Sequence, residues 1–334
     1  MPLKFLLLIC TTFYQIVSCL LEDRKLPPGK RIDIGGYCLH LVMVGESQAG
    51  KPTIVLDHSL GGVEGYLLQG KLAQLGQVCI YDRAGYGWSD SSPEKRTSDR
   101  IVTELDELLT KAEVKPPYVL VGDSFGSYNV RLYAKRFPQK VVGMVLTDGL
   151  HEKEMLEIPF ALQALQYFFI SGFLMSVFGS MLGIVRILKT LGSFELLKGE
   201  LRKFTPEELE PVKRSFCRSQ HWLTMGREMI NLKTSGEQVK EAEEFKDLPI
   251  VSIKANSFFQ PSLWTKLIPL GRANQLREKM HRELLKLSTE CQQVQASQSS
   301  HFVWVDEPDI MVNAVKIILD RLQDSLELDA PHMP

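Results

Sequence analysis

The sequence predicts an α/β protein in which a mostly parallel sheet carries helices on both faces and is interrupted by an inserted helical cap. From about residue 52 to 148, apolar runs of strand length alternate with segments of helix length, which is typical of such a sheet. Residues 151–247 break this alternation, because they contain helix-like sequence and no convincing strand. An apolar run at 248–255 then restores the sheet.

The individual elements follow from apolar spacing and from turn residues. Residues 31–46 predict two alternating strands joined by Gly35-Gly36, which is a hairpin signal. Apolar positions at helical spacing predict a helix from 97 to 112, and Asp306-Glu307-Pro308 predicts the start of the last helix. The remaining predictions are strands at 53–56, 77–81, 119–121, 141–147 and 292–296, and a helix through 275–287.

We expect two structural units, a core formed by residues 30–150 and 248–323 and a helical cap formed by 151–247. The cap contains an uncharged run at 158–185, which at ~1.5 Å per residue is long enough to cross a bilayer. Three interpretations stay open: a membrane span, contact with a membrane surface, and a cap that is buried or lines an acyl pocket, which is favoured. We expect the run to be divided by Pro159, Ser171, Gly172, Gly179 and Gly183.

Composition excludes several classes of protein. The chain has 334 residues, 44% of them hydrophobic, and a formal net charge of −1, so it can bury a large core and has no basic block for nucleic acid. The cysteine spacing has no metal-binding logic, and Cys79 is expected to be a buried thiol in a strand. The sequence therefore predicts no metal, no cofactor and no nucleic-acid partner, and it does not determine the oligomeric state.

The N-terminal segment, residues 1–21, has the pattern of a leader. Lys4 precedes an uncharged, mostly apolar run from residue 5 to 21, with the small residues Val17 and Cys19 near its end. This pattern is typical of a secretory signal peptide, and it also fits an uncleaved signal anchor or, through residues 16–19, a bacterial lipoprotein signal. We expect a secreted or membrane-associated protein of the secretory pathway, with membrane contact through the leader or the cap left open.

The candidate nucleophile is Ser124 in the sequence Gly122-Asp123-Ser124-Phe125-Gly126. An apolar run precedes this motif and a helix-like segment follows it, which is the strand, turn and helix context of a nucleophile elbow. The glycines two before and two after the serine allow neighbouring backbone to approach. The following helix supplies backbone N–H groups where an oxyanion would form.

A serine hydroxyl needs a base, and with this elbow the expected chain order is serine, acid, histidine. Of the seven histidines, His301 alone lies late in the chain, in a loop between the last strand and the last helix. We therefore predict His301 as the base. The others are assigned as follows: His40 to an early strand, His151 to the cap entrance, His221 and His281 to helix surfaces, and His332 to the tail.

The candidate acid is Asp148, at the end of the strand over 141–147. The loop after the strand at 250–255 holds no acid, since no Asp or Glu occurs between Asp247 and Glu278. The alternative is that Asp148 caps the first cap helix. Asp123 is expected to project differently from Ser124, and Asp82 is expected to pair with Arg83 or with nearby backbone in a structural turn.

The predicted oxyanion hole combines the backbone amide of Phe125 with a second amide from the loop over 57–62. Leu60 is the first choice for this second donor, and Ser59 is the next.

Two motifs give the chain a family resemblance. Residues 81–90 read Tyr-Asp-Arg-Ala-Gly-Tyr-Gly-Trp-Ser-Asp, and residues 117–126 read Pro-Tyr-Val-Leu-Val-Gly-Asp-Ser-Phe-Gly. With them, the chain resembles the α/β-hydrolase superfamily across about residues 30–323. The resemblance implies an eight-stranded sheet, a variable cap after the sixth strand and a Ser-His-Asp triad, whose acid in some members follows that strand. His58-Ser59 and Asp123 depart from the family, which commonly has His-Gly and His at these places.

Together these observations predict a serine hydrolase that cleaves a carboxylic ester, with an apolar or lipid-like acyl group suggested by the cap. Ser124 argues against the epoxide hydrolases and haloalkane dehalogenases of this fold, which use an aspartate nucleophile. The alternatives are a non-catalytic binding or scaffold protein, and an amide, thioester or lactone hydrolase or acyltransferase, because fold and triad are shared among these activities.

Overall fold

The computed structural model describes residues 3–157, 160–259 and 270–329. The expectations that concern Pro159 and His332 lie outside these residues, as does part of the loop that follows the strand expected at 250–255. The structure contains an eight-stranded sheet in the order β1-β2-β4-β3-β5-β6-β7-β8. The strands are β1 (Lys30–Asp33), β2 (Cys38–Val44), β3 (Thr53–Asp57), β4 (Val78–Asp82), β5 (Tyr118–Asp123), β6 (Val141–Thr147), β7 (Ile250–Ala255) and β8 (Cys291–Ala296).

The sheet is mostly parallel, as the alternating pattern predicts. β1 and β2 form the expected antiparallel hairpin, and β2 also pairs antiparallel with β4. All other neighbours are parallel, from β4 through β8. The carboxyl ends of β5, β6 and β8 therefore point to the same edge of the sheet, so the loops that follow them can meet.

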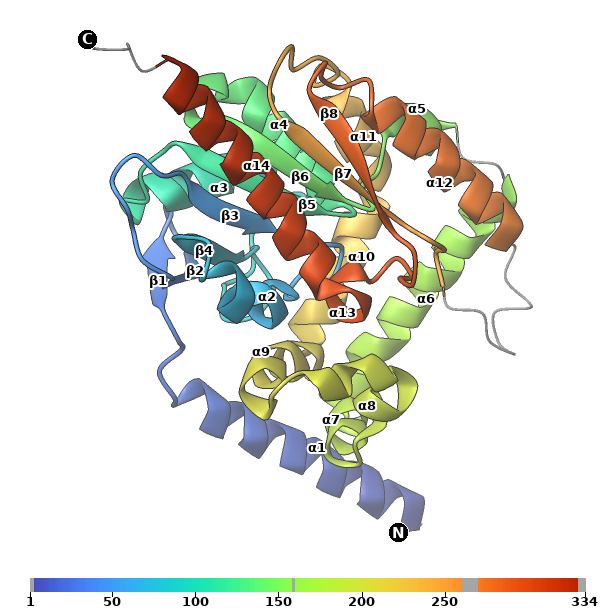
Figure 1. Ribbon diagram of the computed structural model, residues 1–334. Helices are drawn as coiled ribbons and strands as arrows, with labels where there is room; N and C mark the ends of the chain where they lie inside the picture. The colour runs from blue at the N-terminus through green and yellow to red at the C-terminus, as the bar shows by residue number, and fades with distance from the viewer. Residues whose placement is uncertain (1–2, 158–159, 260–269, 330–334) are drawn as a thin grey trace.

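Helices cover both faces of the sheet, and each face has its own apolar core. On one face, α3 (Ser98–Lys111) and α4 (Gly126–Arg136) pack through buried residues such as Leu105 and Val130. On the other, α2 (Gly65–Leu72), α13 (Val303–Asp306) and α14 (Pro308–Asp329) pack through Leu68 and Val315. Figure 1 shows α14 crossing the sheet on the second face. The strands are held rigidly between these two layers.

A helical region is inserted between β6 and β7, where the sequence predicts the cap. The described part of 151–247 contains helices and no strand, as expected. Its α-helices are α5 (Glu152–Leu156), α6 (Phe160–Met181), α7 (Ile184–Thr190), α8 (Ser193–Leu197), α9 (Pro206–Phe216), α10 (Ser219–Ile230) and α11 (Leu232–Val239).

The uncharged run of the cap forms one long helix and not several short ones. Ser171, Gly172 and Gly179 lie inside α6, so the expectation that they divide the run is wrong. A glycine within a helix costs only about 1 kcal/mol relative to alanine, which the surrounding apolar sequence outweighs. Gly183 does end the run, because its φ of +78° belongs to the left-handed region that glycine adopts without strain.

The N-terminal segment forms a helix, α1 (Leu3–Asp23), that lies against the inserted helical region on the side away from the sheet (Figure 1). It contacts α6 and α7. Two helices of the described chain are long and apolar enough to cross a membrane by length and composition, over Lys4–Asp23 and Gln163–Met181.

Three local predictions need correction. α12 (Leu270–Leu284) begins before residue 275, and the loop expected between the last strand and the last helix contains the short helix α13. His221 is 1% exposed, although a surface position was expected. Its ring lies between Tyr86 and Phe216, at centroid distances of 5.1 and 4.3 Å, because α10 packs onto the loop after β4.

Candidate active site

Ser124 stands at a sharp turn between β5 and α4. Its φ of +50° is unusual for a residue with a side chain and is typical of a strained functional turn. A Cβ atom at Gly126 would lie 2.4 Å from the carbonyl oxygen of Asp57, and one at Gly122 would lie 2.6 Å from the side chain of Val130. Both glycines are therefore required by close approach, as the motif predicts.

His301 lies in the loop between β8 and α13 and contacts both other predicted residues. Its Nε2 atom is 2.9 Å from Ser124 Oγ, and its Nδ1 atom is 2.5 Å from a carboxylate oxygen of Asp148. The ring stacks on Phe258 at 4.9 Å between centroids, with an angle of 14° between the planes. The loops after β5, β6 and β8 thus bring Ser124, Asp148 and His301 together.

Asp148 follows β6 in a left-handed conformation, with φ of +42°. Its carboxylate accepts hydrogen bonds from the backbone N–H of Ala255 at 3.2 Å and from Arg277 Nε at 3.0 Å, as well as from His301. The alternative of a helix cap is wrong, because His151 caps α5 by accepting a hydrogen bond from the N–H of Lys153.

The surroundings keep Asp148 ionised. Burial alone would raise the pKa of this carboxyl, but hydrogen bonds from His281 and His301 and the positive charge of Arg277 hold it well below its usual range. An ionised carboxylate at this place fixes the His301 tautomer whose Nδ1 carries the proton, so Nε2 is left to accept a proton from Ser124.

Sequence reasoning missed two partners of Asp148, Arg277 and His281. His281 Nε2 lies 3.0 Å from the carboxylate, and His281 is 1% exposed, so its expected surface position is wrong. Both residues lie on α12 and are four positions apart, which places them on one face of the helix. This spacing on a predicted helix, together with the absence of an acid in the loop after β7, is the sequence signal that could have identified Arg277 and His281.

The two predicted oxyanion donors face the same cavity as Ser124. Leu60 and Phe125 both line it, and among the described residues neither backbone N–H donates a hydrogen bond. The backbone N–H of Ser59, in contrast, donates to the Glu64 carboxylate. Leu60 is therefore free to serve as the second donor and Ser59 is not.

Arg83 holds the loop that carries Leu60. This fully buried side chain donates from Nη1 to the carbonyl of His58 at 2.7 Å and from Nη2 to the carbonyl of Ser59 at 2.7 Å. It also forms ion pairs with Asp57 at 2.6 Å and with Glu228 of α10 at 3.0 Å. Arg83 thus ties the loop to the core and to the inserted helical region, a role that the sequence did not reveal.

Asp82 does not pair with Arg83, which corrects one of the two expected partners. Its carboxylate lies 2.8 Å from His40 Nδ1 and accepts a hydrogen bond from the backbone N–H of Trp88 at 3.0 Å. The second contact closes the turn at 82–88, in agreement with the expected backbone pairing. The strand pairing of β2 with β4 sets His40 opposite Asp82.

Asp123 is buried, 1% exposed, and does not line the cavity, so it projects away from Ser124 as expected. Burial raises the pKa of this carboxyl well above its usual range, and the neighbouring carboxyl groups of Glu64 and Asp57 add to the rise. No hydrogen-bond partner is found for Asp123 Oδ1 among the described residues. Burial therefore favours the protonated form of the carboxyl that lies behind the nucleophile.

The cavity in front of Ser124 has a volume of about 320 Å³. The inserted helical region forms one wall through α6 and α10, and α12 and the His301 loop form the other. Ser124, His301 and Arg277 are its polar groups near the reacting position. The apolar lining includes Leu165, Phe169, Phe173, Met225, Met229, Phe258, Met280 and Trp304. Among the described residues, no group of three or more His, Cys, Asp or Glu side chains could hold a metal ion.

Comparison with known proteins agrees with this architecture. Residues 52–177 match the family model described as alpha/beta hydrolase fold. An AB hydrolase superfamily protein of Gibberella zeae is 25% identical over 270 residues, which cover 73% of this chain and 78% of that protein. The uncharacterized protein YqjL of Bacillus subtilis is 46% identical over 71 residues, which cover 21% of this chain and span only 28% of that protein's length.

Solved structures show the same fold. A probable hydrolytic enzyme from Pseudomonas aeruginosa superimposes with a TM-score of 0.62 at 13% identity, covering 87% of this chain and 94% of that chain. At this level of identity the similarity concerns the fold alone. The chain belongs to the alpha/beta hydrolase fold superfamily, whose members are generally hydrolytic enzymes.

Proposed function

We propose that the protein is a serine hydrolase that cleaves a carboxylic ester. The observation that carries the proposal is the position of His301, with Nε2 at 2.9 Å from Ser124 Oγ and Nδ1 at 2.5 Å from the Asp148 carboxylate. These distances suit a base that takes the serine proton and is oriented by an ionised acid.

In the proposed reaction, Ser124 Oγ attacks the ester carbonyl carbon while its proton passes to His301 Nε2. The carbonyl oxygen becomes an oxyanion, which the backbone N–H groups of Leu60 and Phe125 stabilise. His301 then returns the proton to the leaving alcohol, and an acyl group remains on Ser124. A water molecule, deprotonated by His301, attacks this acyl-enzyme. The bond between the acyl carbon and Ser124 Oγ breaks, His301 returns its proton to Oγ, and the carboxylic acid is released.

The apolar lining of the cavity supports an acyl chain as the substrate group beside Ser124. Phe169 and Phe173 of α6 and Met225 and Met229 of α10 offer contacts that favour hydrocarbon over charged groups. We therefore propose a lipid-like ester as the substrate class, with the helical cap of 151–247 as the unit that selects it. The core of 30–150 and 248–323 carries the reacting groups.

A fluorophosphonate probe tests the proposal directly, because it reacts with activated serines. We expect the full-length chain, purified in mild detergent, to be labelled at Ser124 and the Ser124→Ala variant to remain unlabelled. Ser325→Ala is the matched control, since this exposed serine of α14 donates to the carbonyl of Arg321 and should not affect the probe site. A folded wild-type protein that stays unlabelled would argue for a binding or scaffold role.

The substrate class is tested with p-nitrophenyl esters of increasing acyl length. We expect kcat/KM to rise from the acetate to the octanoate ester, because each methylene buried in the cavity contributes about 0.8 kcal/mol. Faster turnover of the acetate than of the octanoate would contradict an apolar acyl substrate.

A further inference from the structure

The side of α1 that faces the protein is polar. Thr11, Gln15, Cys19 and Glu22 are its inward positions, and they recur every three or four residues. The Gln15 side chain is 6% exposed and is satisfied at both ends. Its amide N–H donates to the carbonyl of Cys217 at 2.8 Å, and its oxygen accepts from Arg186 Nε at 2.6 Å.

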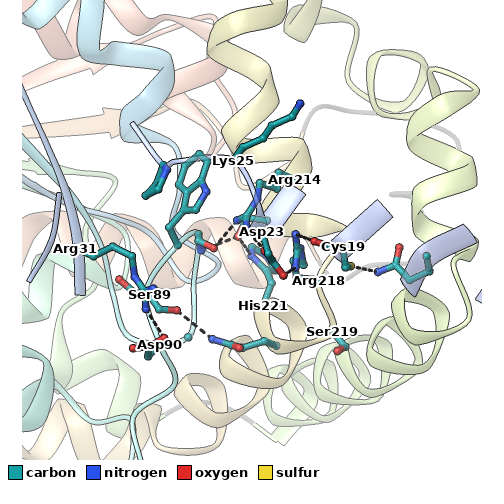
Figure 2. A pocket seen from close by; sticks show the side chains of 17 residues that line it. Cys19, Asp23, Lys25, Arg31, Ser89, Asp90, Arg214, Arg218, Ser219 and His221 are labelled. Carbon is teal, nitrogen blue, oxygen red and sulfur yellow. Dashed lines mark hydrogen bonds and ion pairs between the residues drawn. The ribbon is translucent and has the colours of Figure 1, made fainter. Parts of the chain in front are cut away.

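Ion pairs hold the C-terminal end of α1. Glu22 pairs with Arg186 of α7 and with Arg218 at 2.6 Å. Asp23 pairs with Arg214 of α9 at 3.0 Å and with Arg218 at 2.9 Å. Figure 2 shows Asp23 between these two arginines, at the edge of a polar cavity of about 460 Å³. The contact between α1 and the inserted helical region is thus a polar one, which we call the α1 clasp.

The backbone also fits closely at this contact. Gly183, in the turn between α6 and α7, lies so near Thr11 that a Cβ atom there would be 2.3 Å from the carbonyl oxygen of Thr11. The turn therefore accepts α1 at a distance that only glycine allows. A segment that merely passed over the surface would need neither this close approach nor the buried Gln15.

The opposite side of α1 is apolar and faces outward. An amphipathic helix in water buries its apolar side against the protein and exposes its polar side, and α1 does the reverse. Its outward residues include Phe5 at 57%, Leu7 at 64% and Phe13 at 67% exposure. The other apolar residues of α1 that are exposed are Leu6, Leu8, Ile9, Tyr14, Ile16, Leu20 and Leu21.

The exposed apolar surface continues onto the neighbouring helices. α1 contacts α6 and α7, and both helices carry large exposed apolar side chains. On α6 these are Leu174, Met175, Phe178 and Met181, and on α7 they are Ile184 and Leu188. We call the outward residues of α1 together with these six the apolar face. An exposed apolar face that extends over three contacting helices marks an interaction site.

Apart from Lys4, which is exposed near the N-terminal end of α1, the charged residues of α1 and α7 are held in ion pairs. Arg186 is 4% exposed and pairs with Glu22. Lys189 pairs with Glu210 of α9 at 2.9 Å. The apolar sides therefore point outward while the ionic groups point to the protein, which is the arrangement that an apolar medium outside the protein requires.

We propose that the apolar face is a membrane-docking surface that is seated in one leaflet of a lipid bilayer, with α1 retained as part of the folded protein. The first half of α1 is exposed on all sides from residue 4 to 10. From Lys4 to Phe13 is ten residues, or ~15 Å at ~1.5 Å per residue. This is too short to cross the ~30 Å hydrocarbon core, so the Lys4 ammonium stays with the headgroups of the leaflet that α1 enters. The α1 clasp holds the rest of the helix on the protein, so α1 enters the membrane without crossing it.

Removal of the leader would disturb this arrangement. Cleavage after Cys19 takes away Gln15, so Arg186 Nε and the carbonyl of Cys217 lose their buried partner. A buried polar group without a partner is costly. The α1 clasp thus favours a retained helix over a cleaved signal peptide.

The docking surface lies next to the candidate active site, a step that rests on the proposed function. α6 lines the cavity through Phe169 and Phe173 and carries Met175 and Phe178 on the apolar face. α6 therefore runs from the apolar face to the cavity in front of Ser124. An acyl ester that leaves the membrane along α6 reaches the cavity over an apolar path.

Vesicle flotation tests the docking surface. The full-length chain is mixed with phosphatidylcholine vesicles in 1 M NaCl, which screens attraction between charges, and is centrifuged through a density gradient. We expect the wild type to float and the Phe13→Glu/Phe178→Glu variant to remain at the bottom, a loss of at least tenfold in the floated fraction. Phe13→Leu/Phe178→Leu, which keeps both positions apolar, should float like the wild type.

A second control places two acids on α3 and on the C-terminal end of α14, helices far from α1 in Figure 1. The Thr110→Glu/Gln323→Glu variant should float like the wild type. Flotation of the Phe13→Glu/Phe178→Glu variant at the wild-type level overturns the proposal. So does a wild type that stays at the bottom as a stable dimer in light scattering, because a second copy then covers the apolar face.

Flotation and labelling separate this inference from the proposed function. The Phe13→Glu/Phe178→Glu variant should still react with the fluorophosphonate probe at Ser124, which also shows that it is folded. A protein that floats but is never labelled contradicts the proposed function and leaves the docking surface in place. An N-terminal tag that external protease cannot remove from sealed vesicles would show that α1 crosses the bilayer, which overturns docking in one leaflet.

Discussion

Arg83 positions the oxyanion loop, and a conservative substitution should reveal this. In Arg83→Lys the positive charge remains, but a lysine cannot reach the carbonyls of His58 and Ser59 together with both carboxylates that Arg83 contacts. We expect kcat to fall by about 10²-fold, the size of effect that a misplaced catalytic group produces, with KM changed less.

Steady-state kinetics on a p-nitrophenyl ester measures this effect. Arg136→Lys is the matched control, because Arg136 is a partly exposed arginine that pairs with Asp99 away from the cavity. A kcat that falls no more in Arg83→Lys than in Arg136→Lys would show that the loop does not depend on Arg83.

Asp123 should reduce stability at neutral pH. Its folded-state pKa is raised by burial, so the folded state holds a proton that the unfolded state loses above its pKa of about 3.9. Stability contributed by this site is therefore present below about pH 4 and declines as pH rises above it. We expect Asp123→Asn to have a higher Tm than the wild type at pH 8 and a similar Tm at pH 4.

Calorimetry at both pH values measures the difference. The control is Asp309→Asn, since the Asp309 side chain is 74% exposed and should show no such trend. A Tm that is lower in Asp123→Asn at pH 8 would mean that the carboxylate makes favourable contacts when ionised.

At the scale of residues, the sequence predicts contacts between side chains only where the order of motifs along the chain indicates them. Ser124, Asp148 and His301 follow from the elbow motif, from the end of a strand and from a late loop. Arg277 and Glu228 could not be predicted, because each meets its partner across more than a hundred residues: 129 separate Arg277 from Asp148, and 145 separate Glu228 from Arg83. Such contacts depend on how helices pack.

At the scale of elements, the α1 clasp should control access to the segment that follows α1. In Arg186→Glu, the new carboxylate faces Glu22 and replaces the ion pair that Arg186 forms with it. The two negative charges repel each other, so α1 is pushed away from α7. We expect trypsin to cleave after Arg24 or Lys25 at least fivefold faster in this variant than in the wild type, both in detergent, as followed by mass spectrometry.

Lys189→Glu is the matched control for this experiment. It reverses a charge on the same helix, but its ion pair is with Glu210 of α9 and not with a residue of α1. Equal cleavage rates in Arg186→Glu and Lys189→Glu would indicate that Glu22 contributes nothing to holding α1.

The elements themselves were largely predictable, since strands with a period of two and helices with a period of 3.6 leave clear patterns. The role of α1 was not. A run such as Phe5 to Leu21 looks the same in a cleaved leader and in a retained helix, and only the partners of Gln15 and Glu22 in the fold distinguish them. The continuity of α6 was missed for a related reason, because its glycines are tolerated where neighbouring residues are strong helix formers.

At the scale of the whole molecule, two buried histidines join the inserted helical region to the core. His151 ends the segment after β6 and caps α5 by accepting the N–H of Lys153 at 3.3 Å, which requires an unprotonated ring nitrogen. His221 of α10 packs on Tyr86 in the loop after β4. Burial lowers the pKa of His151 to about 4, with help from Arg131, and lowers the pKa of His221 to about 3.

Both histidines should make the protein sensitive to mild acid. Because their folded-state pKa values lie below the unfolded value of about 6.5, the unfolded state binds more protons between pH 6.5 and 4, and each site lowers stability by about 1.4 kcal/mol per pH unit in that range. We expect urea midpoints to fall steadily below pH 6. His221→Asn, which cannot be protonated, should begin less stable but fall less steeply than the wild type. His332→Asn serves as the control, and parallel slopes in all three proteins would place the acid sensitivity outside His221.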